Sequence, residues 1–308
     1  MRVRLVGLGA VGAGYGSRFV AAGTDFAVIA DAARAQRYRA NPTVVNGHRQ
    51  DFSFCLPGED QPAELVLIAV KADALTEAIQ LVHSCVGPTT VVLSLLNGID
   101  SEKVLQRAFP QAEVPLALSV GIDAVREGRQ VHYNSLGRIV FGPASGEVSA
   151  ALAAVADLFA SVGIAAELRT DMVHQLWWKF MINVGVNQVS AILGAPYRAF
   201  QSPGSPAREA MLAAQAEVIA VAAAEGVTLT QDDVATWLDV LAGLGPDNYT
   251  SMAQDALAGR ATEVDIFAGR VCELGRTHAI PTPVNDLLGH LLAAQPAGAM
   301  RPPGPGCG

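Results

Sequence analysis

The stretch that decides the fold of this chain is Arg2-Val3-Arg4-Leu5-Val6-Gly7-Leu8-Gly9-Ala10-Val11-Gly12, close to the amino terminus. A short strand-forming run leads directly into Gly-x-Gly-x-x-Gly, and the order strand, glycine turn, helix is the context that a dinucleotide-binding fingerprint needs. In that interpretation Gly7 allows the tight turn, Gly9 lets the backbone approach a pyrophosphate, and Gly12 lets the helix pack on the strand. The pyrophosphate would lie against the unpaired N–H groups of the helix start, where the helix dipole favours negative charge. The alternative is a glycine-rich turn that binds nothing.

The composition is typical of a well-packed soluble enzyme. The chain has 308 residues, of which 51% are hydrophobic and 16% charged, and its formal net charge is −8. An acidic chain is poorly suited to nucleic acid or to an anionic membrane surface, and no apolar run approaches the ~18–20 residues that span a bilayer. The four cysteines are scattered and form no C-x-x-C pair, which argues against a disulfide or zinc framework. The start of the chain has no signal-peptide pattern, so the expected location is the cytoplasm.

Strand and helix patterns alternate through the first half of the chain. Strands are expected at 26–30, 64–71 and 90–96, then at 116–120, 130–133 and 138–141, followed by a helix at about 149–162. The run that ends on Lys71 is apolar without interruption, as expected for a central parallel strand covered on both faces. The alternation predicts a doubly wound, parallel-sheet dinucleotide-binding domain of the Rossmann type over residues 1–168.

Asp31 lies at the end of the second expected strand, 19 residues after Gly12. A carboxylate near this position holds the ribose 2′-hydroxyl of NAD in dinucleotide-binding domains. Three arginines follow that could instead attract the additional phosphate of NADP, namely Arg34, Arg37 and Arg39. An interpretation of equal weight makes Asp31 the N-cap of the helix that contains these arginines.

Lys71 and Asn97 each follow an expected strand of the first domain. Open α/β sheets bind their ligands beyond the carboxyl ends of the strands, which makes both residues candidates for the cofactor side of a site. The plainer explanations are a solvated loop lysine and an ordinary Asn-Gly turn.

Strand patterns disappear from about residue 169 onward. Helices are expected at 171–193, 206–225, 231–243, 249–257, 263–277 and 283–294. This pattern predicts an all-α second domain over residues 169–295, followed by a Pro/Gly-rich tail over 296–308.

The segment from His174 to Asn187 holds the polar pattern that points to chemistry. After Gln175 every residue is apolar except Lys179, Asn183 and Asn187, which are spaced four residues apart. That spacing puts the three on one helix face. An unpaired buried amide costs roughly 1–3 kcal/mol and a buried ammonium more, so this face needs a partner such as a polar, anionic ligand in a cleft. The alternative is a snorkelling lysine with both amides bonded to nearby backbone.

Two further segments carry polar residues that could face the same cleft. Asn248 and Ser251 stand at an expected helix start, where capping is the ordinary explanation. Thr262 and Asp265 resemble a capping box, which would put Glu263 in the first helical turn, near the positive end of the dipole.

Taken together, these motifs resemble the ketopantoate reductase (2-dehydropantoate 2-reductase) family from residue 1 to about residue 290. The matching motifs, in order, are Gly7-x-Gly-x-x-Gly12, Val70-Lys71-Ala72, Leu96-Asn97-Gly98, Lys179-x-x-x-Asn183-x-x-x-Asn187, Asn248-x-x-Ser251 and Thr262-Glu263-Val264-Asp265. The lysine–asparagine–asparagine helix followed by the serine and glutamate segments is far more specific than the glycine fingerprint.

The resemblance implies NADPH-dependent reduction of 2-dehydropantoate to pantoate, a step toward pantothenate and coenzyme A. It makes Lys179 the proton donor to the ketone oxygen and Glu263 an assisting residue that also contacts cofactor. The positions that it assigns to substrate are Asn183, Asn187, Asn248 and Ser251, and those that it assigns to cofactor are the Gly7–Gly12 turn, Lys71 and Asn97. The physics agrees, since an ammonium stabilises the charge that builds on a ketone oxygen and can deliver the proton.

Four positions depart from the family pattern. The family commonly has an arginine where Asp31 stands, so we expect NADH to be used at least as well as NADPH. Gln188 stands where many members have proline or alanine. Tyr197 and Ala268 each stand where an asparagine is frequent. These three are expected to alter the pocket wall, which leaves the exact 2-oxo acid open.

Two alternatives to a 2-dehydropantoate 2-reductase are kept. One is an NADH-preferring reductase of another branched 2-oxo acid, and the other is a non-catalytic dinucleotide-binding regulator. The joint presence of Lys179, Asn183, Asn187, Ser251 and Glu263 argues against the regulator, because a sensor would need only the first domain. The expected partner is a small 2-oxo acid, without nucleic acid, membrane or metal, and a homodimer is an option that the sequence leaves open.

Overall fold

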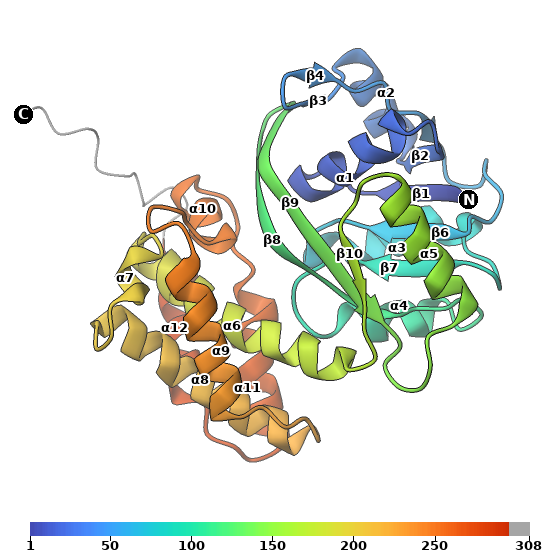
Figure 1. Cartoon of the computed structure of the whole chain (residues 1–308). Coiled ribbons are helices and arrows are strands. Elements are labelled where there is room, and N and C mark those ends of the chain that lie inside the picture. Colours follow the sequence, from blue (N-terminus) through green and yellow to red (C-terminus); the bar gives the residue numbers. More distant parts are fainter. Residues whose placement is uncertain (296–308) are drawn as a thin grey trace, which may run out of the picture. The chain divides into compact units, whose positions relative to one another are not determined.

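A computed structural model describes residues 1–295 of the chain. The chain separates into two compact units, Met1–Val173 and His174–Gly308, and the division falls in the first turn of helix α6, Met172–Leu193. The first unit holds both sheets and the second is helical (Figure 1). The expected Pro/Gly-rich tail at 296–308 lies outside the described residues.

The first unit is built on a five-stranded parallel sheet with the strand order β5-β2-β1-β6-β7. Its strands are β1 (Arg2–Val6), β2 (Asp25–Ile29), β5 (Phe54–Cys55), β6 (Leu65–Ile68) and β7 (Val91–Ser94). The order places β1 in the centre, so the glycine turn that follows it lies in the middle of the carboxyl edge. This arrangement confirms the predicted parallel-sheet fold, although β6 and β7 end earlier than the sequence pattern indicated.

Apolar residues on the two faces of this sheet belong to two separate cores. Leu65 and Leu67 pack with α1 (Ala10–Ala21) and α5 (Ala150–Ser161), whereas Val66 and Ile68 pack with α3 (Leu75–Val82) and α4 (Ser101–Ala108). Successive strand residues point to opposite faces. The uninterrupted apolar run in β6 therefore reflects a strand that is covered on both sides.

A second sheet completes the first unit. The long hairpin of β8 (Leu116–Glu127) and β9 (Gln130–Gly142) is antiparallel, and β9 also pairs in parallel with β3 (Val44–Val45) and β10 (Ala166–Leu168). The short strand β4 (His48–Arg49) pairs with β3. The strands expected at 116–120, 130–133 and 138–141 thus form a sheet of their own instead of extending the parallel one.

Small residues of α1 make room for this second sheet. A Cβ atom added at Gly14 would lie 2.4 Å from the end of the Leu136 side chain in β9, so the glycine lets this side chain pack close against α1. The Tyr15 hydroxyl donates to the Leu136 carbonyl at 2.7 Å. The helix that starts at the glycine turn is therefore fixed against both sheets, as the run of α1 beside β9 in Figure 1 illustrates.

The second unit consists of helices joined by short connections. Besides α6 these are α7 (Arg198–Gln201), α8 (Pro206–Ala224), α9 (Gln231–Gly243), α10 (Ser251–Leu257), α11 (Ala268–Thr277) and α12 (Pro283–Ala293), with a short 3₁₀ turn η3 (Val264–Ile266). Two differences from the sequence prediction matter below: α10 begins two residues late, and the helix expected at 263–277 is interrupted at Phe267. Within residues 1–295, no helix is long and apolar enough to cross a bilayer.

The first unit also contains α2 (Ala32–Ala40) and two 3₁₀ turns, η1 (Ala72–Ala74) and η2 (His83–Cys85). The sequence pattern continues the strand to Lys71, whereas β6 ends at Ile68 and the turn η1 begins at Ala72. Two residues, Ala69 and Val70, separate Ile68 from Lys71, and the ladder ends once Ala69 has donated to the Val6 carbonyl. The lysine therefore belongs to the loop beyond the strand.

Candidate functional site

The Gly7–Gly12 turn shows why two of its glycines are required. Gly7 has φ +97°, and a Cβ atom there would lie 2.4 Å from the Ala69 carbonyl oxygen. A Cβ atom at Gly12 would lie 2.0 Å from the Gly7 carbonyl oxygen. Gly9 differs, since its added Cβ would meet nothing closer than 4.0 Å. Gly7 and Gly12 thus close the turn, while Gly9 leaves open space in front of the backbone.

The start of α1 is suited to an anion. Gly9 occupies the N-cap position, no side chain caps the helix, and its first turn holds no acidic residue. The first N–H groups of a helix have no partner within the helix, and the dipole makes this end favourable for negative charge. The open space at Gly9 and these N–H groups fit a pyrophosphate, so the residues present fit a dinucleotide.

Asp31 is the N-cap of α2, as the second of the two sequence interpretations held. Its Oδ1 atom accepts from the Arg34 N–H at 2.7 Å, and Oδ2 lies 3.5 Å from Arg34 Nε. The side chain remains 40% exposed, so capping leaves part of the carboxylate accessible. A contact between Asp31 and a ribose stays a prediction.

The three arginines of α2 are engaged by other groups. Arg34 donates to both carboxylate oxygens of Glu77, at 2.6 and 3.1 Å. Arg37 and Arg39 lie over the rings of Tyr38 and Phe54, at 5.5 and 5.7 Å from the ring centroids. Their side chains therefore serve packing and ion pairing around α2.

Lys71 and Asn97 lie beyond the carboxyl ends of β6 and β7, which are adjacent parallel strands. Lys71 is exposed and stands just before η1, and the half-buried Asn97 precedes Gly98, whose φ is +92°. Since β6 also pairs with β1, the structure brings Lys71, Asn97 and the glycine turn to one edge of the sheet.

A buried polar chain beneath the Asn97 turn was not recognised from the sequence. Glu102 is 4% exposed; its carboxylate accepts from the Ser101 hydroxyl at 2.9 Å and from the Ala117 N–H at 3.4 Å. The Ser101 and Ser94 hydroxyls are 2.8 Å apart, and Ser94 accepts from the Leu96 N–H at 3.3 Å. These contacts hold the end of β7 and the start of α4 together, although a serine-glutamate pair after a turn offers little sequence signal.

Helix α6 presents the polar stripe in the second unit. Lys179 and Asn183 are half-buried, and Asn187 is only 5% exposed. Among the residues that the structure describes, the side-chain amides of Asn183 and Asn187 have no hydrogen-bond partner. The alternative in which neighbouring backbone satisfies these amides is therefore wrong for residues 1–295.

Aromatic contacts connect the Lys179 turn to the segment that holds Glu263. Phe180 packs edge-on against Trp177, with centroids 5.7 Å apart, and against Phe267 at 6.5 Å. Phe267 directly precedes α11, four residues after Glu263. The packing thus brings the start of α11 next to the lysine-bearing part of α6.

The expected capping box at Thr262 and Asp265 is wrong. Glu263 is the N-cap residue of the short turn η3, and it has no side-chain cap hydrogen bond. Phe267, with φ −107° and ψ −90°, interrupts the helical path before α11 begins. Glu263 consequently does not lie in the first turn of an α-helix, and the dipole argument for this residue does not hold.

Capping explains a neighbouring residue instead of Asn248 or Ser251. Thr250 is the N-cap of α10, and its hydroxyl oxygen accepts from the Ala253 N–H at 3.1 Å. Ser251 is then the first helical residue, and both Asn248 and Ser251 are exposed. Their side chains are not used by the cap, which leaves them accessible to a ligand.

Of the three residues expected to alter the pocket wall, Gln188 and Ala268 do not line a pocket. Gln188 is 0% exposed, and its Nε2 donates to the Val184 carbonyl at 2.7 Å and to Asn285 Oδ1 at 3.1 Å. Ala268 is 2% exposed and packs where α11 meets Gly289 of α12. The expectation that they alter the wall is wrong because both side chains are enclosed by protein. For the half-buried Tyr197 it stays a prediction.

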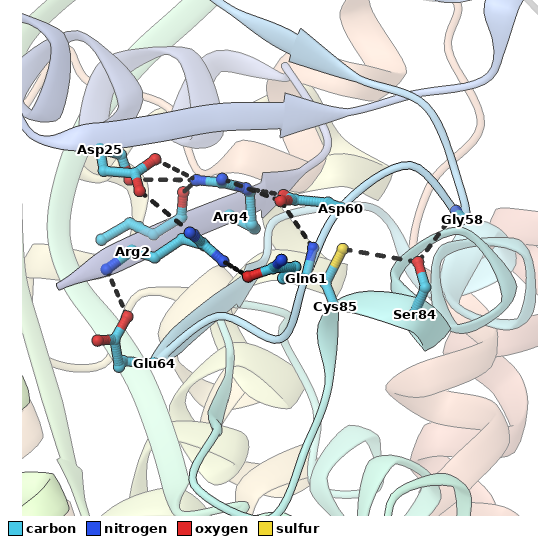
Figure 2. Close-up of polar contacts among 10 residues, drawn as sticks. Arg2, Arg4, Asp25, Gly58, Asp60, Gln61, Glu64, Ser84 and Cys85 are labelled. Atoms are coloured by element: carbon cyan, nitrogen blue, oxygen red, sulfur yellow. Dashed lines mark hydrogen bonds and ion pairs between the residues drawn. The ribbon is translucent and has the colours of Figure 1, made fainter.

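At the amino end of the parallel sheet, a polar cluster is paired within the protein (Figure 2). Arg4, 5% exposed in β1, ion-pairs with Asp60, donates to Asp25 Oδ1 at 3.0 Å and donates to the Val3 carbonyl at 2.9 Å. Burial acts to raise the pKa of the Asp60 carboxyl, but the hydrogen bond and charge of Arg4 outweigh it and lower that pKa. This cluster joins β1, β2 and the loop before β6, which indicates a structural role.

Two family models match nearly the whole chain. "Ketopantoate reductase PanE/ApbA" matches residues 3–146, and "Ketopantoate reductase PanE/ApbA C terminal" matches residues 171–295. The 2-dehydropantoate 2-reductase of Halobacterium salinarum is 31% identical over 75% of this chain and 75% of that protein. The enzyme of the same name from Pyrobaculum aerophilum is 28% identical over 95% of this chain and 97% of its own.

Solved structures show the same fold. A PanE/ApbA family ketopantoate reductase from Ralstonia eutropha JMP134 has a TM-score of 0.79 at 29% identity, covering 95% of this chain and 97% of that one. The ternary structure of D-mandelate dehydrogenase with NADH and anilino(oxo)acetate has a TM-score of 0.85 at 24% identity, covering 96% and 98%.

Proposed function

The chain belongs to the ketopantoate reductase family, and from that premise we propose that it is a 2-dehydropantoate 2-reductase, which reduces the ketone of 2-dehydropantoate to pantoate. At the coarser level, membership makes it an oxidoreductase with a dinucleotide-binding fold, whose relatives act on 2-oxo acids. The observation that carries the finer proposal is the stripe of Lys179, Asn183 and Asn187 on α6.

The amides of Asn183 and Asn187 support a substrate with a carboxylate and a hydroxyl. Within residues 1–295 they have no hydrogen-bond partner, and Asn187 is almost fully enclosed. Neither amide has an atom that is both enclosed and unpartnered, so both stay accessible to a ligand that donates and accepts hydrogen bonds. A 2-oxo acid with a hydroxyl group offers both kinds of partner. Asn248 and Ser251 at the start of α10 are proposed as further substrate contacts.

Lys179 is proposed as the proton donor. When bound, a nicotinamide cofactor supplies the hydride for the ketone carbon. The Lys179 ammonium holds a proton at Nζ, stabilises the charge that builds on the ketone oxygen and transfers that proton to it. Glu263, whose segment packs beside the Lys179 turn through Phe180 and Phe267, is proposed to assist this lysine and to contact cofactor.

The cofactor side is proposed to comprise the glycine turn, Lys71 and Asn97, with the pyrophosphate on the start of α1. For the ribose, we propose that NADH is used at least as well as NADPH. The partly exposed Asp31 carboxylate would repel a 2′-phosphate, and Arg34 is engaged by Glu77. The D-mandelate dehydrogenase of similar fold was solved with NADH.

A second candidate is an NADH-linked reductase of another 2-oxo acid, in which the same residues act on a different side chain. The specific support is Asp31 together with the structural similarity to D-mandelate dehydrogenase, which holds anilino(oxo)acetate. The proposed setting for either activity is the cytoplasm. A homodimer remains a prediction, and a dimeric ketopantoate reductase from Staphylococcus aureus has a related fold, with a TM-score of 0.75.

The test is cofactor oxidation by the purified chain with NADH and NADPH in turn. The panel contains 2-dehydropantoate, 2-oxoisovalerate, which lacks its hydroxyl group, and benzoylformate, the oxo acid of mandelate. We expect the highest kcat/KM with 2-dehydropantoate. A higher kcat/KM with another acid would favour the second candidate, and cofactor binding without turnover of any acid would favour a regulator. A large preference for NADPH would overturn the proposal for Asp31.

A further inference from the structure

A buried polar cluster lies behind the stripe of α6, where α6, α8 and α12 meet. Its members are Gln188 on α6, Gln215 and Glu217 on α8, and Asn285 on α12. Gln188 and Asn285 are 0% exposed and Gln215 is 1% exposed. So many enclosed amides in one helix interface are unusual and need a reason, because each has lost its hydration.

Hydrogen bonds run continuously from α8 through α12 to α6. The Glu217 carboxylate accepts from the Val284 and Asn285 N–H groups, at 2.7 and 2.9 Å, and from Asn285 Nδ2 at 2.7 Å. This carboxylate therefore covers the first turn of α12, where negative charge is favourable. Asn285 Oδ1 then accepts from Gln188 Nε2 at 3.1 Å, and Gln188 Nε2 also donates to the Val184 carbonyl.

This connection meets α6 at the level of the stripe. Gln188 directly follows Asn187, and successive residues are rotated by roughly 100° around a helix axis. The Gln188 side chain thus points away from the stripe and is held by α12 while Asn187 remains on the stripe. Hydrogen bonds are directional and apolar packing is not, so this contact restricts rotation and sliding of α6 more than the surrounding apolar contacts do.

Near Gln188, helices α6 and α8 approach each other at a glycine. Gly185 has no side chain, and a Cβ atom there would lie 2.6 Å from Gln215 Cγ, so α8 lies close against a smooth part of α6. Val186 and Val189 pack into the apolar core of this unit, and the Gln188–Asn285 hydrogen bond adds a directional constraint on the orientation of α6.

We propose that Gln188 is a positioning residue for Asn187: anchored through Asn285 and Glu217, it fixes the rotation of α6 that directs the Asn183 and Asn187 amides at the substrate. This inference rests on the proposed function of those amides. It assigns a role to a residue that departs from the family pattern and that touches no substrate itself.

Gln215 provides a matched control. It is as enclosed as Gln188 and lies against the same part of α6, but neither of its amide atoms has a hydrogen-bond partner among the described residues. Replacing it removes volume and a desolvated amide without breaking a directional contact. If Gln188 had only a structural role, replacing Gln188 and replacing Gln215 should have the same effect on kinetics and stability.

The experiment compares Gln188→Met with Gln215→Met in the full chain by steady-state kinetics with 2-dehydropantoate and by thermal unfolding. In Gln188→Met we expect KM for the 2-oxo acid to rise about tenfold, because a tenfold change corresponds to the free energy of about one hydrogen bond. The values of kcat and of KM for the cofactor should stay within about threefold of those of the parent chain. In Gln215→Met all three constants should match the parent chain, with an equal or higher Tm. An unchanged 2-oxo acid KM in Gln188→Met, or an equal rise in both variants, would overturn the proposal.

Two further measurements keep the result decisive. Adding Asn285→Leu to Gln188→Met should raise KM no further, because both changes break the same contact; additive effects would contradict this. If Gln188→Met does not fold, Gln188→Ala removes the same amide.

If the parent chain reduces no 2-oxo acid, the proposed function fails by itself. Hydrogen exchange then tests the anchor alone: amides 183–188 should exchange faster in Gln188→Met but not in Gln215→Met.

Discussion

Two regions of the molecule enclose polar side chains and treat them in opposite ways. Around Arg4, at the amino end of the parallel sheet, the guanidinium is met by two carboxylates and a backbone carbonyl (Figure 2). Along the stripe of α6, the amides of Asn183 and Asn187 have no hydrogen-bond partner within residues 1–295.

The difference separates polar groups that stabilise the fold from polar groups that remain available to a ligand. Pairing inside the fold recovers the cost of desolvation, so the Arg4 cluster needs no ligand and contributes to stability. A side-chain amide that makes no hydrogen bond inside the fold, as at Asn183 and Asn187, remains available to a ligand. Changes in the two regions should therefore affect different quantities.

The largest effect is expected on turnover at Lys179. Replacing it in Lys179→Ala should lower kcat about 10²–10⁴-fold, the range typical of removing a general acid, with cofactor affinity near normal. The control is Lys103→Ala, an exposed lysine of α4, which should leave kcat unchanged. Steady-state kinetics measure this change, and a kcat in Lys179→Ala equal to that of the parent chain would contradict the proton-donor assignment.

A change in the Arg4 cluster should affect stability and spare catalysis. In Asp60→Asn the enclosed Arg4 loses one charged partner, which should lower the free energy of unfolding by about 3 kcal/mol, as measured by urea denaturation. Asp51→Asn is the matched control: its ion pair with Arg49 is exposed, and its loss should cost no more than about 1 kcal/mol. Similar losses in both variants would contradict a special role for the Arg4 cluster.

A change in the α6 stripe should affect substrate binding and spare stability. Replacing Asn187 by an apolar side chain of similar size, in Asn187→Leu, should raise the 2-oxo acid KM about 10–100-fold because a hydrogen bond to a polar ligand is lost. The free energy of unfolding should change little, because this amide makes no hydrogen bond to any described residue. A marked loss of stability with an unchanged KM would make Asn187 a structural residue like Asp60.

The smallest effect concerns acid. Arg4 lowers the pKa of the folded-state Asp60 carboxyl, whereas the unfolded chain has the ordinary value of about 3.9. The stabilisation from this carboxylate is therefore complete above the unfolded pKa and is lost as the pH falls through the folded pKa. Urea denaturation at a series of acidic pH values should show a shallower decline for Asp60→Asn than for the parent chain. Parallel curves would mean that other carboxylates dominate acid unfolding.

Local sequence patterns predicted much of the fold and the sheet edge that carries the candidate cofactor residues. The Gly7 and Gly12 positions follow from backbone sterics, and the apolar run of β6 follows from burial on both faces. Helix ends in the second unit were placed within a few residues because their caps are local. The stripe of α6 was visible because four-residue spacing on a helix needs no partner to be recognised.

Contacts between distant segments could not be predicted. Arg4 looks like any residue of a strand until Asp60, 56 positions away, is brought beside it. The family comparison predicts Gln188 in a pocket wall, whereas Asn285, 97 positions away, holds its side chain inside the protein. The capping box predicted at Thr262 is wrong for the same reason. The helix is interrupted at Phe267, which packs against the distant Phe180, and a local motif does not reveal this contact.

The sequence by itself determined the glycine turn, the alternation of strands and helices and the face of α6 that carries Lys179, because each depends on the conformation of neighbouring residues. Only the tertiary structure decided which polar groups are paired: Arg4 with Asp25 and Asp60, and Gln188 Nε2 with Asn285. Gln188 Oε1 and the stripe amides have no hydrogen-bond partner among the described residues. Pairing depends on which distant segments meet in three dimensions, and that information is distributed over the whole chain.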